Sequence, residues 1–142
     1  MAMIPENLHE HINAAYPENV CIVGTVQPGG WVQISPRGSV LVHDGDTLAY
    51  WDRGSGTTHD QVADGSLVTV FFRNPNIREL LPKGGVARFY GTASVHTEGP
   101  MRDEIYGKLI QPERDKDPDK KGRAVLLKLQ RAENIAHDPL AD

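Results

Sequence analysis

Short runs of alternating apolar and polar residues, separated by turn-forming residues, make up most of the chain. The runs 20–27 and 31–35 are separated by Pro28-Gly29-Gly30, and the runs 40–43 and 47–51 by a segment that contains Asp-Gly. Alternation with a period of two is typical of half-buried strands, and Asp-Gly is a strong hairpin signal. The pattern therefore predicts two consecutive β-hairpins.

The second half of the chain contains three further strand-like runs. The run 66–73 is rich in Val and Phe and is broken by Asn74-Pro75-Asn76, after which a single turn is expected over 77–81. A long strand is expected over 86–97, where Gly91 suggests a bulge or a close backbone approach. The last strand is expected over 124–129.

Three segments have the spacing of helices rather than strands. Apolar side chains recur on one helical face of 6–15, and again in the segment that Pro100 opens. These positions are Leu8, Ile12 and Ala15 in the first segment, and Met101, Ile105 and Leu109 in the second. A shorter helix is expected over 58–64, and a charged loop over 111–123.

Six or seven strands joined mostly by tight turns, with only a few short helices, indicate a mainly β (α+β) protein. The arrangement favours a small antiparallel barrel over alternating βαβ units, so a Rossmann fold is not expected. A chain of 142 residues suits one domain, which we expect to span 1–142.

Composition excludes several classes of function. Fifteen basic and nineteen acidic residues give a formal net charge of −4, without a long block of one sign, which does not favour nucleic-acid binding. No apolar run reaches the length of a membrane span, and no signal peptide is recognisable. The single cysteine, Cys21, lies in an apolar run and is expected to be buried. We therefore expect a cytoplasmic protein.

The segment 51–58 has the composition of a phosphate-binding turn. Arg53 supplies a guanidinium group, Gly56 backbone freedom, and Ser55, Thr57 and Thr58 hydroxyl donors. The alternative is an ordinary Gly/Ser turn between a strand and a helix.

A second basic turn, Ser35-Pro36-Arg37-Gly38-Ser39, comes shortly before the hairpin that carries Arg53. Arg37 and Arg53 would then face one phosphate from adjacent strands. The alternative is that Arg37 is a solvated turn residue.

Other chemistries lack the required spacing. The six histidines do not form a metal-ligand pattern, and the alternating Asp115, Asp117 and Asp119 lack the glycine and glutamate of a calcium loop. No metal site is expected. Neither a Walker loop nor a Gly-x-Ser-x-Gly elbow occurs, and burial would make Cys21 a poor nucleophile.

The ordered set of segments 35–39, 47–58, 67–72 and 88–93 resembles the pyridoxamine 5′-phosphate oxidase-like family of FMN-binding split barrels. The long strand contains Arg88-Phe89-Tyr90-Gly91-Thr92-Ala93 and is followed by a helix that Gly-Pro opens, as in that family. The resemblance implies a six-stranded antiparallel split β-barrel that forms a homodimer, with FMN bound at the subunit interface.

The same resemblance implies which residues hold the cofactor. Arg53, Ser55, Gly56, Thr57 and Thr58 correspond to the phosphate-binding turn. Arg37, with Gly38 and Ser39, corresponds to the preceding basic position. Tyr50 and Trp51 lie where family strands run beside the isoalloxazine ring, which Trp51 or Trp31 could flank. Trp31 and Tyr90 could equally pack in the core or at an interface.

The chain departs from the true oxidase, which has a basic pair where Thr57-Thr58 stand here. We therefore expect an FMN-dependent oxidoreductase-type protein whose partner is an unknown small substrate or a nicotinamide electron donor. No protein acid or base is required, because the flavin carries the chemistry. The alternatives are an F420-dependent reductase, and a flavin or haem carrier without turnover.

Overall fold

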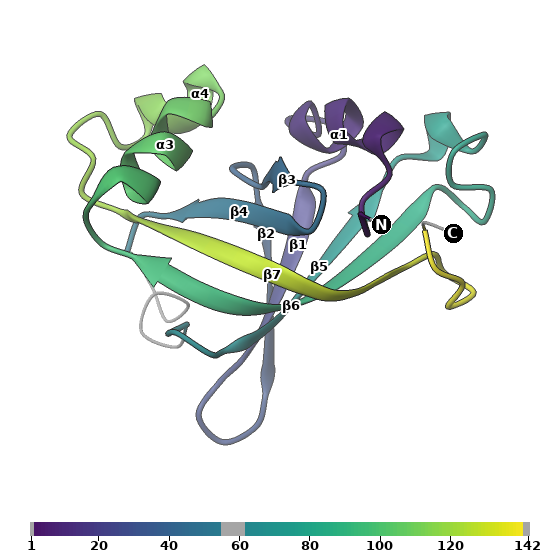
Figure 1. Cartoon of the computed structure of the whole chain (residues 1–142), viewed down its shortest axis with the longest axis horizontal. Coiled ribbons are helices and arrows are strands. Elements are labelled where there is room, and N and C mark those ends of the chain that lie inside the picture. The colour runs from purple at the N-terminus through teal and green to yellow at the C-terminus, as the bar shows by residue number, and fades with distance from the viewer. Residues whose placement is uncertain (1, 55–61, 141–142) are drawn as a thin grey trace.

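The protein is built on one curled antiparallel sheet, with short helices packed against it (Figure 1). The computed structural model describes residues 2–54 and 62–140. The strands are β1 (Cys21–Val26), β2 (Val32–Arg37), β3 (Leu41–Asp44), β4 (Thr47–Asp52), β5 (Leu67–Arg73), β6 (Val86–His96) and β7 (Arg123–Glu133). The helices are α1 (Glu6–Asn13), η1 (Pro75–Ile77), α3 (Pro100–Lys108) and α4 (Gln111–Asp115). The mainly β fold class is confirmed.

The two expected hairpins are confirmed: β1 pairs with β2, and β3 pairs with β4. The described residues form seven strands in the order β2-β1-β5-β6-β7-β4-β3, so the expected number of six is wrong. The sequence itself contains seven apolar runs, and each of them forms a strand. The number six came from the family resemblance, and the short edge strand β3 raises the total to seven.

The sheet curls because a very short link joins its two edge strands. In a flat sheet, seven strands would place the outermost two about 29 Å apart. Arg37 ends β2 at one edge and Leu41 begins β3 at the other, and the four intervening Cα steps span at most about 14 Å. The sheet must therefore bend until its edges approach each other. We call the connecting residues Gly38, Ser39 and Val40 the seam.

Helix α1 packs its apolar face on the β3 side of the sheet, and the expected face is confirmed because Leu8 and Ile12 are buried. Helix α3 lies against β4 and β7, where Ile105 and Leu109 are buried. Within the described residues, no helix is long and apolar enough to cross a membrane.

Two expectations outside the sheet need correction. The segment 111–123 is not a loop throughout, because α4 forms at its start with a proline in its first turn. The helix expected over 58–64 falls mostly outside the described residues, and residues 62–64 are not helical.

The strand β4 separates two apolar cores, since all six of its residues are buried. The larger core fills the inside of the curled sheet and includes Leu48 and Tyr50. The smaller core lies under α3 and includes Ala49 and Trp51. Alternation along a strand sends successive side chains to opposite faces, so Asp52 follows Tyr50 to the barrel side.

Candidate functional site

The predicted phosphate-binding turn begins where β4 ends. Arg53 is exposed, and Gly54 adopts a φ of 81°, a conformation that glycine accepts without strain. Ser55, Gly56, Thr57 and Thr58 lie outside the described residues. The structure therefore places the start of this turn at the surface, directly after the buried carboxylate of Asp52.

Two arginines reach Asp52 from other strands. Arg123, which pairs with Asp52 across β4 and β7, places Nη2 at 3.3 Å and Nε at 3.4 Å from Asp52 Oδ2. Arg37, at the end of β2, places Nη1 at 3.9 Å from Asp52 Oδ1. The Asp52 side chain is only 1% exposed, so this carboxylate depends on its partners. We call Arg37, Tyr50, Asp52 and Arg123 the arginine cluster.

The arginine cluster contains buried polar atoms without a hydrogen-bond partner. Among the described residues there are three such side-chain atoms: Arg37 Nε, the Tyr50 hydroxyl oxygen, and Thr25 Oγ1 in β1. The guanidinium carbon of Arg37 lies 5.5 Å from the centre of the Tyr50 ring, so two of the three occur side by side. Buried polar groups are normally satisfied, and exceptions call for an explanation such as a ligand or water.

The local charges favour an anion as that ligand. Two guanidinium groups against one carboxylate leave one net positive charge among the described groups of the cluster. Burial raises the pKa of the Tyr50 hydroxyl to about 12, with Arg37 and Arg123 opposing this shift and Asp52 adding to it. The hydroxyl therefore keeps its proton and remains a hydrogen-bond donor.

The seam residues Gly38 and Ser39 are fixed by neighbouring elements. Ser39 Oγ accepts a hydrogen bond from the Trp51 backbone N–H (3.0 Å) and donates one to the Trp51 carbonyl oxygen (3.2 Å). A Cβ atom on Gly38 would lie 2.8 Å from Glu113 Oε2, so a larger residue would displace α4 or the Glu113 side chain. These contacts attach the seam to β4 and α4.

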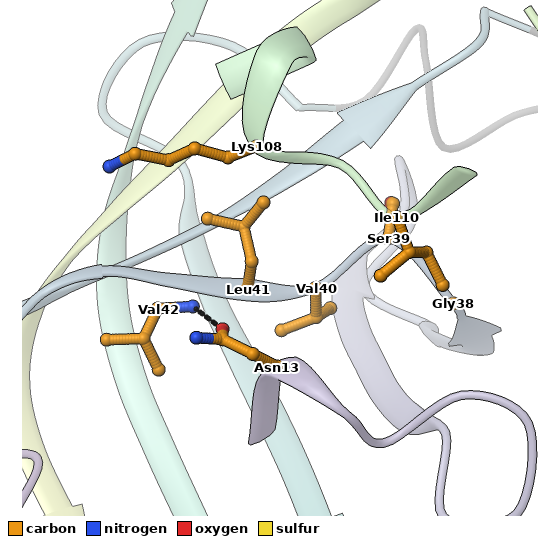
Figure 2. A pocket seen from close by; sticks show the side chains of 8 residues that line it. All are labelled: Asn13, Gly38, Ser39, Val40, Leu41, Val42, Lys108 and Ile110. Atoms are coloured by element: carbon orange, nitrogen blue, oxygen red, sulfur yellow. Dashed lines mark hydrogen bonds between the residues drawn. The ribbon is translucent and has the colours of Figure 1, made fainter. Parts of the chain in front are cut away.

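A cavity of about 290 Å³ opens beside the seam (Figure 2). Its walls come from residues 38–42, from Asn13 of α1, and from Lys108 and Ile110 at the end of α3. Asn13 Oδ1 accepts the Val42 N–H (2.8 Å), as Figure 2 shows. The backbone of the edge strand β3 thus borders a space that could receive a planar group.

Charged side chains gather at the Lys108 end of this cavity. Lys108 Nζ lies 3.2 Å from His43 Nδ1 and 3.2 Å from Glu104 Oε2, and the His43 and Glu104 atoms are 3.5 Å apart. His43, Glu104 and Lys108 thus form a small group of polar side chains at this end of the cavity.

The Trp51 side chain lies in the smaller core, away from the arginine cluster. Its Nε1–H donates to Asp117 Oδ2 (2.8 Å), its ring meets Tyr106 edge-on at 5.1 Å, and Arg102 lies 5.1 Å from the ring centre. Trp51 is 3% exposed. Trp31, in the turn before β2, is 77% exposed, and β2 lies at the opposite end of the strand order from β4 and β3.

Asp117 organises the segment before β7. Besides Trp51, it accepts hydrogen bonds from the backbone N–H groups of Lys121 (3.0 Å) and Gly122 (2.8 Å). Burial acts to raise its pKa, but these hydrogen bonds and the charge of Arg102 outweigh burial, so the pKa is lowered. The expectation of a solvated loop does not hold for Asp117, which is buried.

Sequence reasoning brought forward Arg37 and Arg53 but missed Asp52, Arg123 and Asp117. Asp52 lies inside the segment that was singled out, and its position after five buried residues could have marked it as a buried charge. Arg123 is 71 residues away along the chain. Only the strand pairing of β4 with β7 reveals its role.

The sequence profile described as pyridoxamine 5′-phosphate oxidase matches residues 6–138 of the chain. The chain therefore belongs to the pyridoxamine 5′-phosphate oxidase-like family, as the resemblance indicated. No curated protein matches the chain.

Solved structures share the fold at low sequence identity. HupZ of Group A Streptococcus is 23% identical with a TM-score of 0.71, and the match covers 98% of this chain and 99% of that one. An FMN-binding protein from Syntrophomonas wolfei subsp. wolfei is 19% identical with a TM-score of 0.63, covering 89% and 82%. An F420 reductase is 13% identical with a TM-score of 0.62, covering 92% and 98%. At these identities the similarity establishes the fold alone.

Proposed function

We propose that the protein binds FMN and acts as a flavin-dependent oxidoreductase. The observation that carries the proposal is the pair of unpartnered buried polar atoms, Arg37 Nε and the Tyr50 hydroxyl, in a cluster with net positive charge. A phosphate group offers several acceptor oxygens and negative charge, which suits such donors. Membership of the oxidase-like family and the FMN-binding structural neighbour support the same cofactor.

In the proposed complex the phosphate lies at the end of β4 and the ring along the seam. Arg37 and Arg53 would neutralise the phosphate, and Ser55, Gly56, Thr57 and Thr58 would surround it. The flavin ring would lie along Gly38, Ser39 and the backbone of β3, in the cavity that Figure 2 shows. Tyr50 and Trp51 would support this wall from behind, since both are buried.

The flavin would supply hydride or electron transfer, while the chain's own residues bind, orient and shield it. The cavity of about 290 Å³ is at the lower limit of ligand pockets, which run from roughly 300 to 1,000 Å³. One chain therefore encloses only part of the cofactor. The open side of the cavity would leave room for a nicotinamide donor or a small substrate beside the bound ring.

We propose that the second wall comes from another copy of the chain, in a homodimer. Exposed apolar side chains occur on β1, β2 and β5 and in the turn before β2; they are Val26, Trp31, Val32, Ile34 and Leu67. The turn between β1 and β2, which precedes Trp31, projects beyond the rest of the sheet (Figure 1). Contiguous apolar surface of this kind is typical of interfaces. Light scattering on the wild type and on Trp31→Ser/Ile34→Ser should give the mass of a dimer and of a monomer, respectively.

The test of cofactor binding is a titration of the apoprotein with FMN and, as a matched control, with riboflavin. Riboflavin has the same ring but lacks the phosphate, so tighter quenching by FMN measures the phosphate contribution. Bleaching of the bound flavin by NADH or NADPH would support an oxidoreductase, whereas a flavin that stays oxidised would indicate a carrier. Binding of F420 or haem in place of FMN would overturn the cofactor assignment.

A further inference from the structure

The two arginines of the arginine cluster are held very differently. Within the described residues, Arg123 donates two hydrogen bonds to Asp52 Oδ2 and one from Nη2 to the Val62 carbonyl oxygen (2.9 Å). Among the described residues, the contacts of Arg37 are the 3.9 Å ion pair with Asp52 and the approach to the Tyr50 ring. Its Nε has no partner within the described part of the chain. One arginine is fixed, and the other is loosely held.

The two carboxylate oxygens of Asp52 face different arginines. Oδ2 is engaged by Arg123, whereas Oδ1 accepts the Gly54 backbone N–H (3.1 Å) and faces Arg37 at a longer distance. If Arg37 moved away, Oδ1 would keep a hydrogen bond and Oδ2 would keep a charged partner. Asp52 would therefore remain satisfied without Arg37. The Arg37 side chain is also 17% exposed, so the guanidinium has access to a ligand at the surface.

We propose that Asp52 is a positioning residue from which Arg37 transfers to the phosphate group of the incoming ligand, while Arg123 stays on Asp52. The proposal rests on the proposed function only for the identity of the ligand, because any phosphate could draw Arg37 away. The transfer exchanges a long ion pair for charge-assisted hydrogen bonds and gives Arg37 Nε an acceptor. Asp52 Oδ1 also accepts the Gly54 N–H, so one carboxylate contacts both Arg37 and the start of the predicted phosphate-binding turn.

The transfer predicts an unusual effect of neutralising Asp52. In Asp52→Asn, Arg37 has no carboxylate to leave, so phosphate binding should become about tenfold tighter. Arg37→Gln should weaken phosphate binding by about tenfold or more, as expected for a lost charge-assisted contact. In the double variant Asp52→Asn/Arg37→Gln the gain should disappear, because it acts through Arg37.

The experiment measures binding of inorganic phosphate by thermal shift and of FMN and riboflavin by fluorescence quenching, in all four proteins. Asp119→Asn is the matched control, because it removes the same charge from an exposed position. A gain in Asp52→Asn that persists without Arg37 would show a general charge effect and overturn the transfer. A loss of affinity in Asp52→Asn would show that Asp52 merely holds Arg37 in place, and would also overturn it.

A second measurement needs no change at Asp52, which matters if Asp52→Asn fails to fold. In the wild type, the NMR signal of the Arg37 Nε–H should shift on addition of phosphate, while that of Arg123 should stay. Arg37→Gln assigns the Arg37 signal. Equal shifts of both signals, or none, would overturn the transfer.

The outcomes separate this inference from the proposed function. A phosphate response through Arg37 without flavin binding would keep the transfer and overturn the FMN assignment. Flavin binding with no preference for FMN over riboflavin and no phosphate response would leave a flavin protein but overturn the transfer.

Discussion

Trp51 and Asp52 are neighbours on β4, yet the polar groups around them differ in how completely they are hydrogen-bonded. On the α3 side, the Trp51 indole N–H and both oxygens of Asp117 are engaged in hydrogen bonds of 2.8–3.0 Å. On the barrel side, Asp52 has partners, but Arg37 Nε and the nearby Tyr50 hydroxyl have no hydrogen-bond partner in the part of the chain that the structure describes. The first region is a completed network, and the second has spare donors.

The difference separates a structural role from a binding role. A completed buried network stabilises one arrangement of the chain, because any movement leaves a group unsatisfied. Unpartnered donors cost stability in the free protein, and a ligand that supplies acceptors recovers that cost. Such a region is expected where the chain must bind something.

The largest effect is expected on the completed side. Asp117→Ala leaves the Trp51 indole and two backbone N–H groups without their acceptor, so we expect a loss of about 3 kcal/mol in the free energy of unfolding. Urea denaturation measures it, with the exposed Asp119→Ala as control. FMN affinity of the folded fraction should be unchanged. A loss below about 0.5 kcal/mol would mean that the network is not structural.

Arg53 tests the binding side at the surface. Arg53→Ala should weaken FMN binding by about 1.5–3 kcal/mol, the scale of a charge-assisted contact, without unfolding the protein. Riboflavin binding should change little, and Arg73→Ala, at another exposed arginine, should change neither. Unaltered FMN affinity in Arg53→Ala would remove this residue from the site.

Substitutions of the two arginines that contact Asp52 should lower the free energy of unfolding by different amounts. Arg123→Gln removes the charged donor that contacts Asp52 Oδ2 and leaves Arg37 at 3.9 Å as the other arginine near this buried carboxylate, so we expect a loss of about 2 kcal/mol in the free energy of unfolding. Arg37→Gln removes a loosely held side chain and should cost less than about 1 kcal/mol. Equal losses in urea denaturation would contradict the asymmetry seen in the distances.

The smallest changes in the free energy of unfolding are expected when the hydroxyl of Tyr106 or Tyr50 is removed. Tyr106→Phe removes a hydroxyl that donates to the Asp117 carbonyl oxygen (3.0 Å), and should cost about 1 kcal/mol. Tyr50→Phe removes a buried hydroxyl that has no hydrogen-bond partner among residues 2–54 and 62–140, so the free energy of unfolding should stay within about 0.5 kcal/mol or rise. A larger loss for Tyr50→Phe than for Tyr106→Phe would show that the barrel-side hydroxyl is structural.

The elements of this fold could be read from the sequence because they depend on local patterns. Alternation and turn residues gave both hairpins, and the spacing of Leu8 and Ile12 gave α1. The short helix α4 was missed because its charged residues suggested a loop, while Pro112 and the neighbouring fold favour a helical turn. The strand number was wrong where a family expectation replaced the count of apolar runs.

The site was only partly predictable, because it depends on contacts between distant segments. Arg37 and Arg53 could be predicted as phosphate ligands because each lies beside glycine and serine residues in the sequence. The partnership of Asp52 with Arg123 depends on the pairing of β4 with β7, and the burial of Asp117 depends on Trp51, 66 residues away. No local pattern distinguishes a buried aspartate in a charged segment from a solvated one.

The position of Arg37 at the end of β2 makes its contact with Asp52 depend on the register of the edge strands. Because a slip of one residue turns every side chain of a strand to the opposite face, β2 cannot slide on β1 without turning Arg37 away from Asp52. A larger slip of β2 would also act on β3, since three residues link the two strands. The observed register of β2 on β1 is therefore the one in which the Arg37 guanidinium faces the Asp52 carboxylate.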